Sequence, residues 1–535
     1  MEPKKPSYYI TTPIYYVNAD PHLGTAYCTM LCDVQARFRR ATGYDVKFLT
    51  GMDEHGEKVA EAAEAHGMSP QEWCDYQAPH FEALWDELEI SNDDFIRTTE
   101  PRQHTAVQYL WNRMLESGYL YKDNYDGWYC VPEETYFTGT QVQKADELRG
   151  TPGAHLCPDC GRPLERRQEE SYFFRLSAFQ DKLLAYYDEH PDFVQPDFRM
   201  NEVRSFVESG LQDTCVSRTT FDWGIPVPFD EGHVTYVWFD ALLNYMTAVG
   251  YGLPGEEAAA DYARRWPAQV HMIGKDIIRF HCILWPAMHM AIGEPLPEQV
   301  FAHGFLMVKD DETGKDIKMS KSLGNAIAPR DVVDFMGVEG YRYYFMTDVK
   351  HGEDSGISFG RMAQVYNADL ANTWGNLVSR SLNMCVKYFD GRVPELAGPL
   401  SAGNPLAAAA EGLAERYAEK MGRFDYQGAA RDVMDFAGVA NHYIEDSAPW
   451  TLAKDPARAG ELAEVIYSLV EAIRIVAHLL MPFMPTTSTE ALRRIGCEGE
   501  AATDDLLAVC TWGRLKSGLP VEKGDPLFPR LDTKK

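Results

Sequence analysis

The pattern of apolar and polar positions divides the chain into a region of alternating strands and helices and a region of helices only. Near the start, YYITTPIYYV (8–17) is rich in β-branched and aromatic residues, which favours a buried strand. Apolar residues then recur at helical spacing from Tyr27 to Phe38. A second strand is predicted at 45–51 and a second helix at 56–67. Strands and helices in alternation indicate a parallel sheet covered by helices.

Residues 118–225 interrupt this alternation. They contain cysteines, the Gly-rich stretch RGTPGAH (149–155) and short mixed elements, so an inserted domain is predicted there. The α/β pattern resumes at 233–245 and continues through 269–285 and 300–308.

After about residue 356 the pattern is helical throughout, and two apolar stripes predict amphipathic helices packed in a bundle. The stripes contain Met362, Val365, Tyr366, Leu370, Trp374, Leu377 and Val378, and Leu462, Val465, Ile466, Leu469, Val470, Ile473 and Leu480. Residues 501–535 are expected to form a tail that packs back loosely.

The composition is that of a folded globular protein, with 45% of its 535 residues hydrophobic and 24% charged. The length suggests roughly two to four domains. The net charge of −29 argues against a non-specific nucleic-acid coat, which needs many exposed cations to neutralise phosphates. A local basic channel is still compatible with it, because binding depends on the field at a patch.

The N-terminus and the cysteines bear on the location of the protein. MEPKKPSYYITTPIYYV has no long apolar run and no small-residue cleavage site, so no signal peptide is predicted. The most apolar segment, 475–485, is broken by His and Pro and is too short to span a membrane. Eleven scattered cysteines fit reduced thiols. A cytoplasmic protein is therefore expected.

Two separated stretches contain side chains suited to phosphate. His22 lies in a tight turn, PHLG (21–24), before a helix whose positive end and backbone N–H groups favour an anion. KDIKMSKSLGN (315–325) gathers lysines and serines that donate to polyphosphate, although a surface loop would also explain such a run. The absence of GxxxxGK[ST] counts against an ordinary P-loop enzyme. Together the stretches indicate attack on the α-phosphate of ATP with pyrophosphate leaving.

HLG (22–24) and KMSKS (318–322) resemble, in this order, the two signatures of the class I aminoacyl-tRNA synthetases. The surrounding text resembles the methionine-specific members in particular, from Tyr8 into the helical region. The stretches that carry this resemblance are TTPIYYVNADPHLG, FLTGMDEHG, SYFF, HVTYVWFDALLNY and IGKDIIRFH. It implies a Rossmann-like α/β catalytic domain with a parallel sheet, an inserted connective domain and an all-α helix-bundle domain that binds the anticodon.

The resemblance also implies a division into segments. They are the first half of the catalytic domain (1–117), the connective knuckle domain (118–225), the second half of the catalytic domain (226–295), a KMSKS-loop region that contacts the tRNA stem (296–355), the anticodon-binding bundle (356–500) and a C-terminal tail (501–535). Because the chain ends soon after the bundle, without a further dimerisation module, a monomer is expected.

The reaction implied by the resemblance joins methionine to ATP, giving methionyl-adenylate and pyrophosphate, and then passes the methionyl group to the 3′-terminal adenosine of methionine tRNA. Mg²⁺ is implied by the polyphosphate chemistry. The residues expected to bind ATP are His22, Gly24, Thr25, Lys318, Ser320, Lys321 and Ser322, with His22, Lys318 and Lys321 as the catalytic groups. Thr25 departs from the family, which usually has a second histidine at that place.

A methionine site needs a carboxylate for the ammonium group and an apolar, adaptable wall for the thioether. By the resemblance, Asp53 supplies the carboxylate, and Tyr16 and His281 can offer hydrogen bonds to sulfur. The expected wall is Ile14, Tyr16, Trp238, Ala241, Leu242, Tyr245, Ile277 and His281. An insert this short has no room for a large editing domain, which favours methionine over valine, isoleucine or leucine.

LCPDCGRP (156–163) contains a CxxC pair with the Pro and Gly that zinc knuckles favour. The family's matching first pair is CVPE here, in which Glu133 replaces a cysteine. Two outcomes are open: Zn²⁺ bound by three thiolates with Glu133 or His155, or buried free thiols without metal. The three thiols are those of Cys130, Cys157 and Cys160.

In the bundle, Asn376 and Arg380 share one helical face, and Trp450 follows a proline at a predicted helix turn. Unstacked RNA bases are bound by aromatic stacking and by hydrogen bonds to base edges. In the resembled family the matching positions contact the CAU anticodon. Without that family context, Asn376 and Arg380 could be ordinary helix-surface residues, and Trp450 could fill the end of the bundle.

Two other functions are open on the sequence. A class I synthetase for another small apolar amino acid would need a larger editing insert, or a wall without Trp238 and His281. A non-catalytic tRNA-binding paralogue should have lost the phosphate-binding residues, of which only Thr25 departs from the family pattern.

Overall fold

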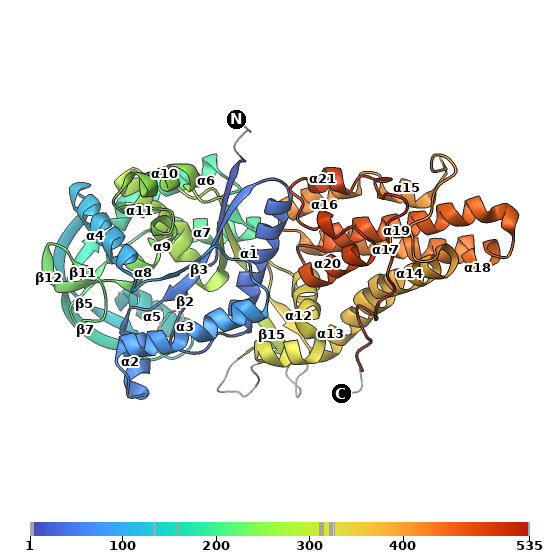
Figure 1. The fold of residues 1–535 in the computed structure, drawn as a ribbon. Helices are drawn as coiled ribbons and strands as arrows, with labels where there is room; N and C mark the ends of the chain where they lie inside the picture. The colour runs from blue at the N-terminus through green and yellow to red at the C-terminus, as the bar shows by residue number, and fades with distance from the viewer. Residues whose placement is uncertain are drawn as a thin grey trace.

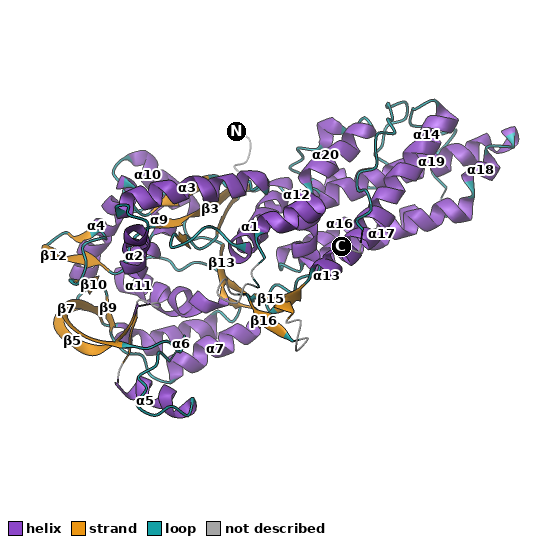
Figure 2. Cartoon of the chain, turned by 90° about the horizontal axis from the view of Figure 1, so that it is seen from below, coloured by secondary structure: helices purple, strands orange, loops and turns teal. Residues whose placement is uncertain are grey.

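The computed structural model describes residues 5–532 except 132–134, 138, 159, 310–314, 320–324, 326 and 402. The chain forms an α/β half that contains the N-terminus and a helical half beside it (Figure 1). In the view from below, the strands are confined to the first half and to its border with the helices (Figure 2). The predicted fold class, a parallel α/β domain with an insert and a following helix bundle, is confirmed.

The α/β half is built on a seven-stranded sheet in which all pairings are parallel. The order is β2-β3-β1-β13-β14-β8, and β4 also pairs with β3. The strands are β1 (Ser7–Thr11), β2 (Tyr15–Tyr16), β3 (Asp45–Asp53), β4 (Asp94–Arg97), β8 (Val194–Gln195), β13 (Val270–Gly274) and β14 (Val300–His303). The strand predicted at 8–17 is thus two strands, because Pro13 has no N–H to pair between them.

Helices cover both faces of this sheet. They are α1 (Leu23–Ala41), α2 (Glu57–Ala65), α3 (Pro70–Glu87), α4 (Pro101–Glu116), α8 (Val237–Ala241), α9 (Asn244–Thr247), α10 (Glu256–Arg265) and α11 (Trp285–Ile292), with a 3₁₀ turn at Lys275–Ile277 and a π-helical turn at Phe280–Leu284. Helix α1 is buried along most of its length, because it lies between the sheet and the helical half.

The connective region carries its own antiparallel sheet, in the order β6-β5-β7-β9. Its elements are β5 (Leu120–Cys130), β6 (Thr135–Phe137), α5 (Gly139–Leu148), β7 (Glu165–Phe174), a 3₁₀ turn (Leu176–Phe179), α6 (Gln180–Glu189), α7 (Asp197–Glu208) and β9 (Thr214–Cys215), followed by a small sheet of β10 (Ser217–Arg218), β11 (Pro226–Val227) and β12 (Asp230–Thr235). Strand β8, within the same stretch of sequence, joins the main sheet beside β14. A strand of two residues is too short to leave a periodic signal.

A small sheet and a long helix connect the two halves. Their elements are β15 (Leu306–Lys309), β16 (Asp316–Lys318), α12 (Pro329–Thr347) and β17 (Ser355–Ile357). Arg342 of α12 is fully buried, and its Nη2 donates to Asp33 Oδ2 of α1 at 2.6 Å. Burial acts to raise the pKa of Asp33, but Arg342 and Arg37 outweigh it and lower that pKa to about 2. The same guanidinium donates to the carbonyl of Phe483 at 2.9 Å, so one cation joins three segments of the chain.

The helical half surrounds one central helix, α19. Its elements are α13 (Phe359–Val365), a π-helical stretch (Tyr366–Gly375), α14 (Asn376–Phe389), α15 (Pro405–Ala410), α16 (Leu413–Gly422), α17 (Tyr426–Ser447), α18 (Pro449–Leu452), a 3₁₀ turn (Pro456–Arg458), α19 (Ala459–Leu480), α20 (Pro485–Arg494), a second 3₁₀ turn (Glu498–Glu500) and α21 (Leu506–Val509). The sequence predicted an amphipathic α19, but its polar Glu471 and Arg474 are also buried and pair with each other at 2.7 Å. Their mutual pairing makes burial on all sides tolerable.

The C-terminal tail packs firmly along the bundle, not loosely as expected. Leu515, Val521 and Phe528 are buried, and Asn367 forms hydrogen bonds with both backbone groups of Leu531. Among the helices that the structure describes, none is long and apolar enough to cross a bilayer.

Candidate active site and RNA-binding residues

A cavity of about 360 Å³ opens at the carboxyl ends of the parallel strands, between β1 and β13. The strand order reverses there, and in such sheets ligands bind at this point because the neighbouring loops separate. Strand ends contribute Pro13, Ile14, Tyr15, Tyr16, Asp53, Gly274, Asp276, Ile277, His303 and Phe305. Helices and their caps add His22, Gly24, Thr25, Cys28, Lys58, Val237, Trp238 and Phe280.

One wall of the cavity is the N-terminus of α1, which His22 caps. Its Nδ1 accepts hydrogen bonds from the backbone N–H groups of Gly24 (3.1 Å) and Thr25 (3.3 Å). Because Nδ1 is an acceptor, the neutral ring carries its proton on Nε2. A Cβ on Gly24 would lie 3.1 Å from His22 Cε1, so the glycine lets the ring fold over the helix end. The wall thus combines a side-chain N–H with a positive helix end, which suits a phosphate.

Thr25, which replaces the family's second histidine, has a structural role in this wall. Its Oγ1 accepts a hydrogen bond from the His22 backbone N–H at 3.0 Å, which completes a capping box. The Thr25 side chain is buried. The hydroxyl therefore fixes the turn that orients His22, a role that the sequence analysis did not predict.

Part of the predicted methionine site lines the cavity, and part lies behind it. The lining residues are Ile14, Tyr16, Asp53, Trp238 and Ile277. The residues buried behind the wall are Ala241, Leu242, Tyr245 and His281. Trp238 lies flat on Phe280, with ring centres 3.9 Å apart and planes within 5°. An aromatic stack of this kind gives the cavity a broad apolar surface.

A chain of hydrogen bonds supports this wall from the protein interior. Tyr245 Oη donates to His281 Nε2 at 2.7 Å, and His281 Nδ1 donates to the carbonyl of Ile277 at 3.1 Å. Burial lowers the pKa of His281 to about 4, so the ring is neutral at pH 7, as these bonds require. Both ring nitrogens are engaged within the protein. The predicted hydrogen bond from His281 to sulfur is therefore not available in this arrangement.

Several cavity residues were missed by the sequence analysis: Lys58, Asp276, Phe280, His303 and Phe305. Asp276 lies two residues beyond the end of β13, and His303 is the last residue of β14, at the edge where parallel sheets bind ligands. That rule could have found both. The Lys58 ammonium lies 5.0 Å from the centre of the Tyr16 ring. Nothing in the local sequence indicates this contact.

The lysine-rich stretch starts beside the cavity. Phe305 lines the cavity and leads into β15, which pairs with β16, so that Lys318 lies opposite Met307. The strand pair therefore anchors the start of this stretch at the cavity edge. The Lys318 side chain and the predicted ATP-binding residues Ser320, Lys321 and Ser322 lie outside the described part of the chain.

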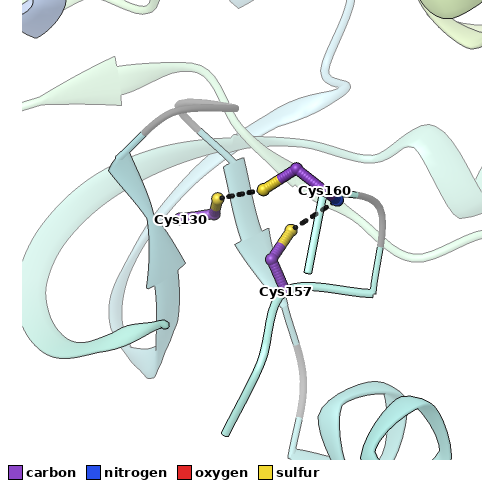
Figure 3. A group of neighbouring side chains, drawn as sticks. All are labelled: Cys130, Cys157 and Cys160. Atoms are coloured by element: carbon purple, nitrogen blue, oxygen red, sulfur yellow. Dashed lines mark hydrogen bonds between the residues drawn. The ribbon is translucent and has the colours of Figure 1, made fainter. Parts of the chain in front are cut away.

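The connective region brings three thiols together. The sulfur atoms of Cys130, Cys157 and Cys160 lie within 4.8 Å of one another (Figure 3). The Sγ atoms of Cys130 and Cys160 are 3.6 Å apart, and the backbone N–H of Cys160 donates to Cys157 Sγ at 3.5 Å. Three converging sulfurs are most of a tetrahedral zinc site.

Of the two candidates for the fourth ligand, only His155 belongs to the part of the chain that the structure describes, and it is not in this cluster. The His155 ring stacks on Trp128, with centres 4.1 Å apart, and is exposed. Glu133 lies outside the described residues.

Two of the three predicted RNA-binding residues, Asn376 and Arg380, lie on α14, and Trp450 lies on α18, the short helix that follows α17 (Figure 1). Asn376 Nδ2 donates to Asn441 Oδ1 at 3.1 Å, and Arg380 forms an ion pair of 2.6 Å with Glu445, one turn further along α17. Trp450, just beyond the end of α17, is 41% exposed. A tryptophan that fills the end of the bundle would be buried, so the exposure of Trp450 argues against that role.

Known protein families match the chain in two parts. A family described as "tRNA synthetases class I (M)" matches residues 8–382, which is more than half of the chain. A family described as "Anticodon binding domain of methionyl tRNA ligase" matches residues 393–535. The chain belongs to the methionyl-tRNA synthetases.

Individual methionyl-tRNA synthetases are similar over nearly the whole chain. A methionine–tRNA ligase of Caldanaerobacter subterraneus subsp. tengcongensis is 45% identical, over 99% of this chain and 80% of its own length. One of Rhizobium meliloti is 47% identical over 98% of both chains. The solved structure of Mycobacterium tuberculosis methionyl-tRNA synthetase in complex with methionyl-adenylate has a TM-score of 0.90 at 41% identity, covering 98% of this chain and 100% of that one.

In this methionyl-tRNA synthetase, tertiary structure joins residues that are far apart in the sequence. His22, Asp53 and Trp238 line one cavity. Asn376 and Trp450 lie in the other half of the molecule (Figure 1). The catalytic and RNA-binding candidates therefore form two separate sites.

Proposed function

We propose that this synthetase activates L-methionine with ATP and transfers the methionyl group to the 3′-terminal adenosine of methionine tRNA. The observation that carries the proposal is a single cavity that joins a phosphate-suited helix end to a buried carboxylate and an apolar wall. Adenylation needs these three features within reach of one reacting centre.

In the first step, a methionine carboxylate oxygen attacks the α-phosphorus of ATP, and the bond to the β-phosphate oxygen breaks with its electron pair. Negative charge grows on the phosphoryl oxygens, where His22 Nε2–H and the α1 N-terminus stabilise it. Gly24 lets the phosphates approach the helix end. Lys318 and Lys321, with Ser320 and Ser322, neutralise the leaving pyrophosphate. Mg²⁺ bound to the ATP phosphates would supply further positive charge against this build-up.

Asp53 pairs with the methionine ammonium group, and its position at the end of β3 directs it into the cavity. Ile14, Tyr16, Trp238 and Ile277 contact the thioether. The support of Ile277 by His281 and Tyr245 holds the wall at a fixed distance from Asp53. Selectivity for methionine then comes from a preformed shape.

Asn376, Arg380 and Trp450 bind the CAU anticodon. Exposed ion pairs such as Arg380–Glu445 contribute little to the free energy of unfolding. An RNA group can therefore replace Glu445 as the partner of Arg380 with little loss of stability. Trp450 offers an exposed face on which a base can stack.

The thiol cluster fits a structural Zn²⁺ site. Cys130, Cys157 and Cys160 would hold the ion, and Glu133 is a candidate for the fourth ligand. A bound ion would hold the knuckle together and take no part in the reaction. Burial raises the pKa of the Cys160 thiol, so binding would displace its proton. Metal analysis of purified protein tests this; protein without zinc would leave the free-thiol alternative.

We further propose a cytoplasmic monomer. None of the eleven cysteines is in a disulfide, which fits a reducing compartment. Light scattering of the purified protein should give about the chain mass of 60.5 kDa.

The first experiment is exchange of labelled pyrophosphate into ATP, measured with each proteinogenic amino acid separately. Exchange with methionine alone supports both the chemistry and the cavity. Exchange with another amino acid would overturn the methionine site. No exchange with any amino acid would favour a non-catalytic tRNA-binding protein and direct attention to Thr25.

A further inference from the structure

A cluster of buried polar side chains adjoins the elements that carry the proposed methionine site, and no step of the proposed reaction uses it. Its members are His55, Asp240 and Gln103, which are 3%, 0% and 0% exposed. His55 Nδ1 donates to Asp240 Oδ2 at 2.6 Å, and Gln103 Nε2 donates to Asp240 Oδ1 at 2.8 Å. Both oxygens of the Asp240 carboxylate are therefore bound within the protein. None of the three residues is among the described residues that line the active-site cavity.

The cluster joins the two elements that carry the methionine site. Asp53, assigned to the ammonium group, is the last residue of β3, and His55 follows it by two positions. Trp238, assigned to the thioether, lies in α8, and Asp240 follows it by two positions. The bond between His55 and Asp240 therefore connects positions 185 residues apart and holds the end of β3 against α8. Gln103, from α4, also donates to the backbone carbonyl of Asp240 at 2.8 Å, which fixes the helix itself.

The turn that carries His55 is fixed on its other side by Trp223. The indole Nε1 of Trp223 donates to the carbonyl of Glu54 at 2.6 Å, and the N–H of Gly56 donates to the carbonyl of Trp223 at 3.3 Å. The indole also meets the His55 ring edge to face, with centres 5.4 Å apart and planes at 62°. Gly56 has a φ of +106°, a backbone conformation that glycine adopts without strain. The His55 ring is thus held in one orientation.

Stability of the fold does not by itself account for this polar pair. A buried carboxylate loses its hydration, and apolar residues of similar volume often stabilise a core equally well. What the pair adds is a hydrogen bond of defined length and direction between β3 and α8. The separation of these two elements sets how far the Asp53 carboxylate lies from the Trp238 ring.

We propose that the bond between His55 and Asp240 positions methionine. It fixes the distance between the Asp53 carboxylate and the Trp238 ring, at a value that matches the length of the methionine side chain. This inference rests on the proposed function, because that function places the ammonium group at Asp53 and the thioether at Trp238. His55 and Asp240 are positioning residues that act through these two contacts. Their loss weakens methionine binding and leaves ATP binding unchanged.

The test replaces His55 by phenylalanine, which keeps a ring and removes the donor to Asp240. His104→Phe is the matched control: this neighbouring histidine has its ring 5.6 Å from that of His55, and its Nε2 has no hydrogen-bond partner among the described residues. Pyrophosphate exchange gives the KM for each substrate. Because a bond to a carboxylate is lost, His55→Phe should raise the KM for methionine roughly 10- to 100-fold and leave the KM for ATP unchanged. The control should match the wild type.

Two further variants separate a positioning role from a merely structural one. In His55→Asn the amide N–H can take the place of Nδ1 and donate to Asp240, so the KM for methionine should return to within about threefold of the wild type. In the double variant of His55→Phe and Trp238→Leu, the losses should fall short of their sum, because His55 acts through Trp238. A lower melting temperature with an unchanged KM for methionine, equal rises in both KM values, or additive losses would overturn the proposal.

If His55→Phe does not fold, Gln103→Leu removes a different donor from Asp240. It should raise the KM for methionine by a smaller factor, again without a change in the KM for ATP, and an unchanged KM for methionine would overturn the proposal. Calorimetric titration with methionine alone needs no ATP, so it tests the inference separately from the reaction. Wild-type affinity for methionine in His55→Phe would overturn the inference. Absence of exchange by the wild-type enzyme with any amino acid would instead defeat the proposed function.

Discussion

The catalytic cavity and the RNA-binding edge of the bundle are prepared for their ligands in opposite ways. Around the cavity, buried side chains hold one another, as Tyr245, His281 and the carbonyl of Ile277 do. At the bundle edge, Arg380 and Trp450 are partly exposed, and the arginine forms a surface ion pair with Glu445. A small ligand offers few contacts and needs a preorganised wall, whereas RNA brings many contacts and can reorder exposed side chains.

Helix α1 physically connects the two regions. Its N-terminus is capped by His22 at the cavity, and the carbonyl of Leu31 accepts a hydrogen bond of 2.9 Å from Tyr426 of α17. Two residues beyond Leu31, Asp33 forms the buried ion pair with Arg342. Helix α1 therefore carries one wall of the cavity and packs against the start of α17, whose other end lies beside the RNA-binding candidates, and substitutions at both sites can be compared in the same assays.

The largest effect is expected at His22. In His22→Asn the amide still caps α1, but the Nε2–H donor to phosphate is lost, so the rate of pyrophosphate exchange should fall roughly 10²- to 10³-fold at an unchanged melting temperature. His22→Ala is the control, because it should also lose about 1 kcal/mol of helix capping. Wild-type exchange by His22→Asn would remove His22 from the reaction.

At the bundle edge, Trp450→Ala should reduce kcat/KM for tRNA in aminoacylation by roughly 5- to 100-fold through the loss of base stacking. Pyrophosphate exchange, which needs no tRNA, should be unchanged. Val439→Ala, on α17 and 39% exposed, is the matched control. Normal charging by Trp450→Ala would contradict the proposed anticodon contact.

A smaller effect is expected from Tyr245→Phe, which leaves the buried His281 Nε2 without its donor. The cost of about 1–2 kcal/mol should raise the KM for methionine in the exchange assay roughly 5- to 30-fold. Tyr251→Phe removes a buried hydroxyl that has no hydrogen-bond partner among the described residues, and it should leave KM unchanged. Equal effects of the two variants would show that the Tyr245 bond does not support the wall.

The last expected effect is on stability and leaves activity at pH 7 unchanged: it is a pH dependence of unfolding. Burial lowers the pKa of His281 from 6.5 to about 4 in the folded protein, so the unfolded chain binds more protons between these values. The contribution of neutral, buried His281 to the free energy of unfolding is complete above pH 6.5. It is lost as the pH falls toward 4, by about 1.4 kcal/mol per pH unit. Urea unfolding at several pH values should show a shallower slope for His281→Gln than for the wild type. Identical slopes would mean that the folded protein accepts the proton on His281.

Much of the fold and part of the site could be deduced from the sequence, because the signals are short-range. Alternation of strands and helices indicates a parallel sheet, and HLG before a helix indicates a phosphate site. The residues Asp53 and Trp238 were predicted for the site through the resemblance, and both line the cavity. Strand β8 was missed, since two residues leave no period.

Tertiary packing alone decided which side chains support one another. The sequence cannot show that Thr25 binds the His22 backbone, that His281 is engaged on both nitrogens, or that α19 is buried on all sides. Asp33 and Arg342 are 309 positions apart, and nothing in either local sequence encodes their pairing. Local preferences act over a few residues, whereas burial and hydrogen-bond partners depend on which distant segments share the same core.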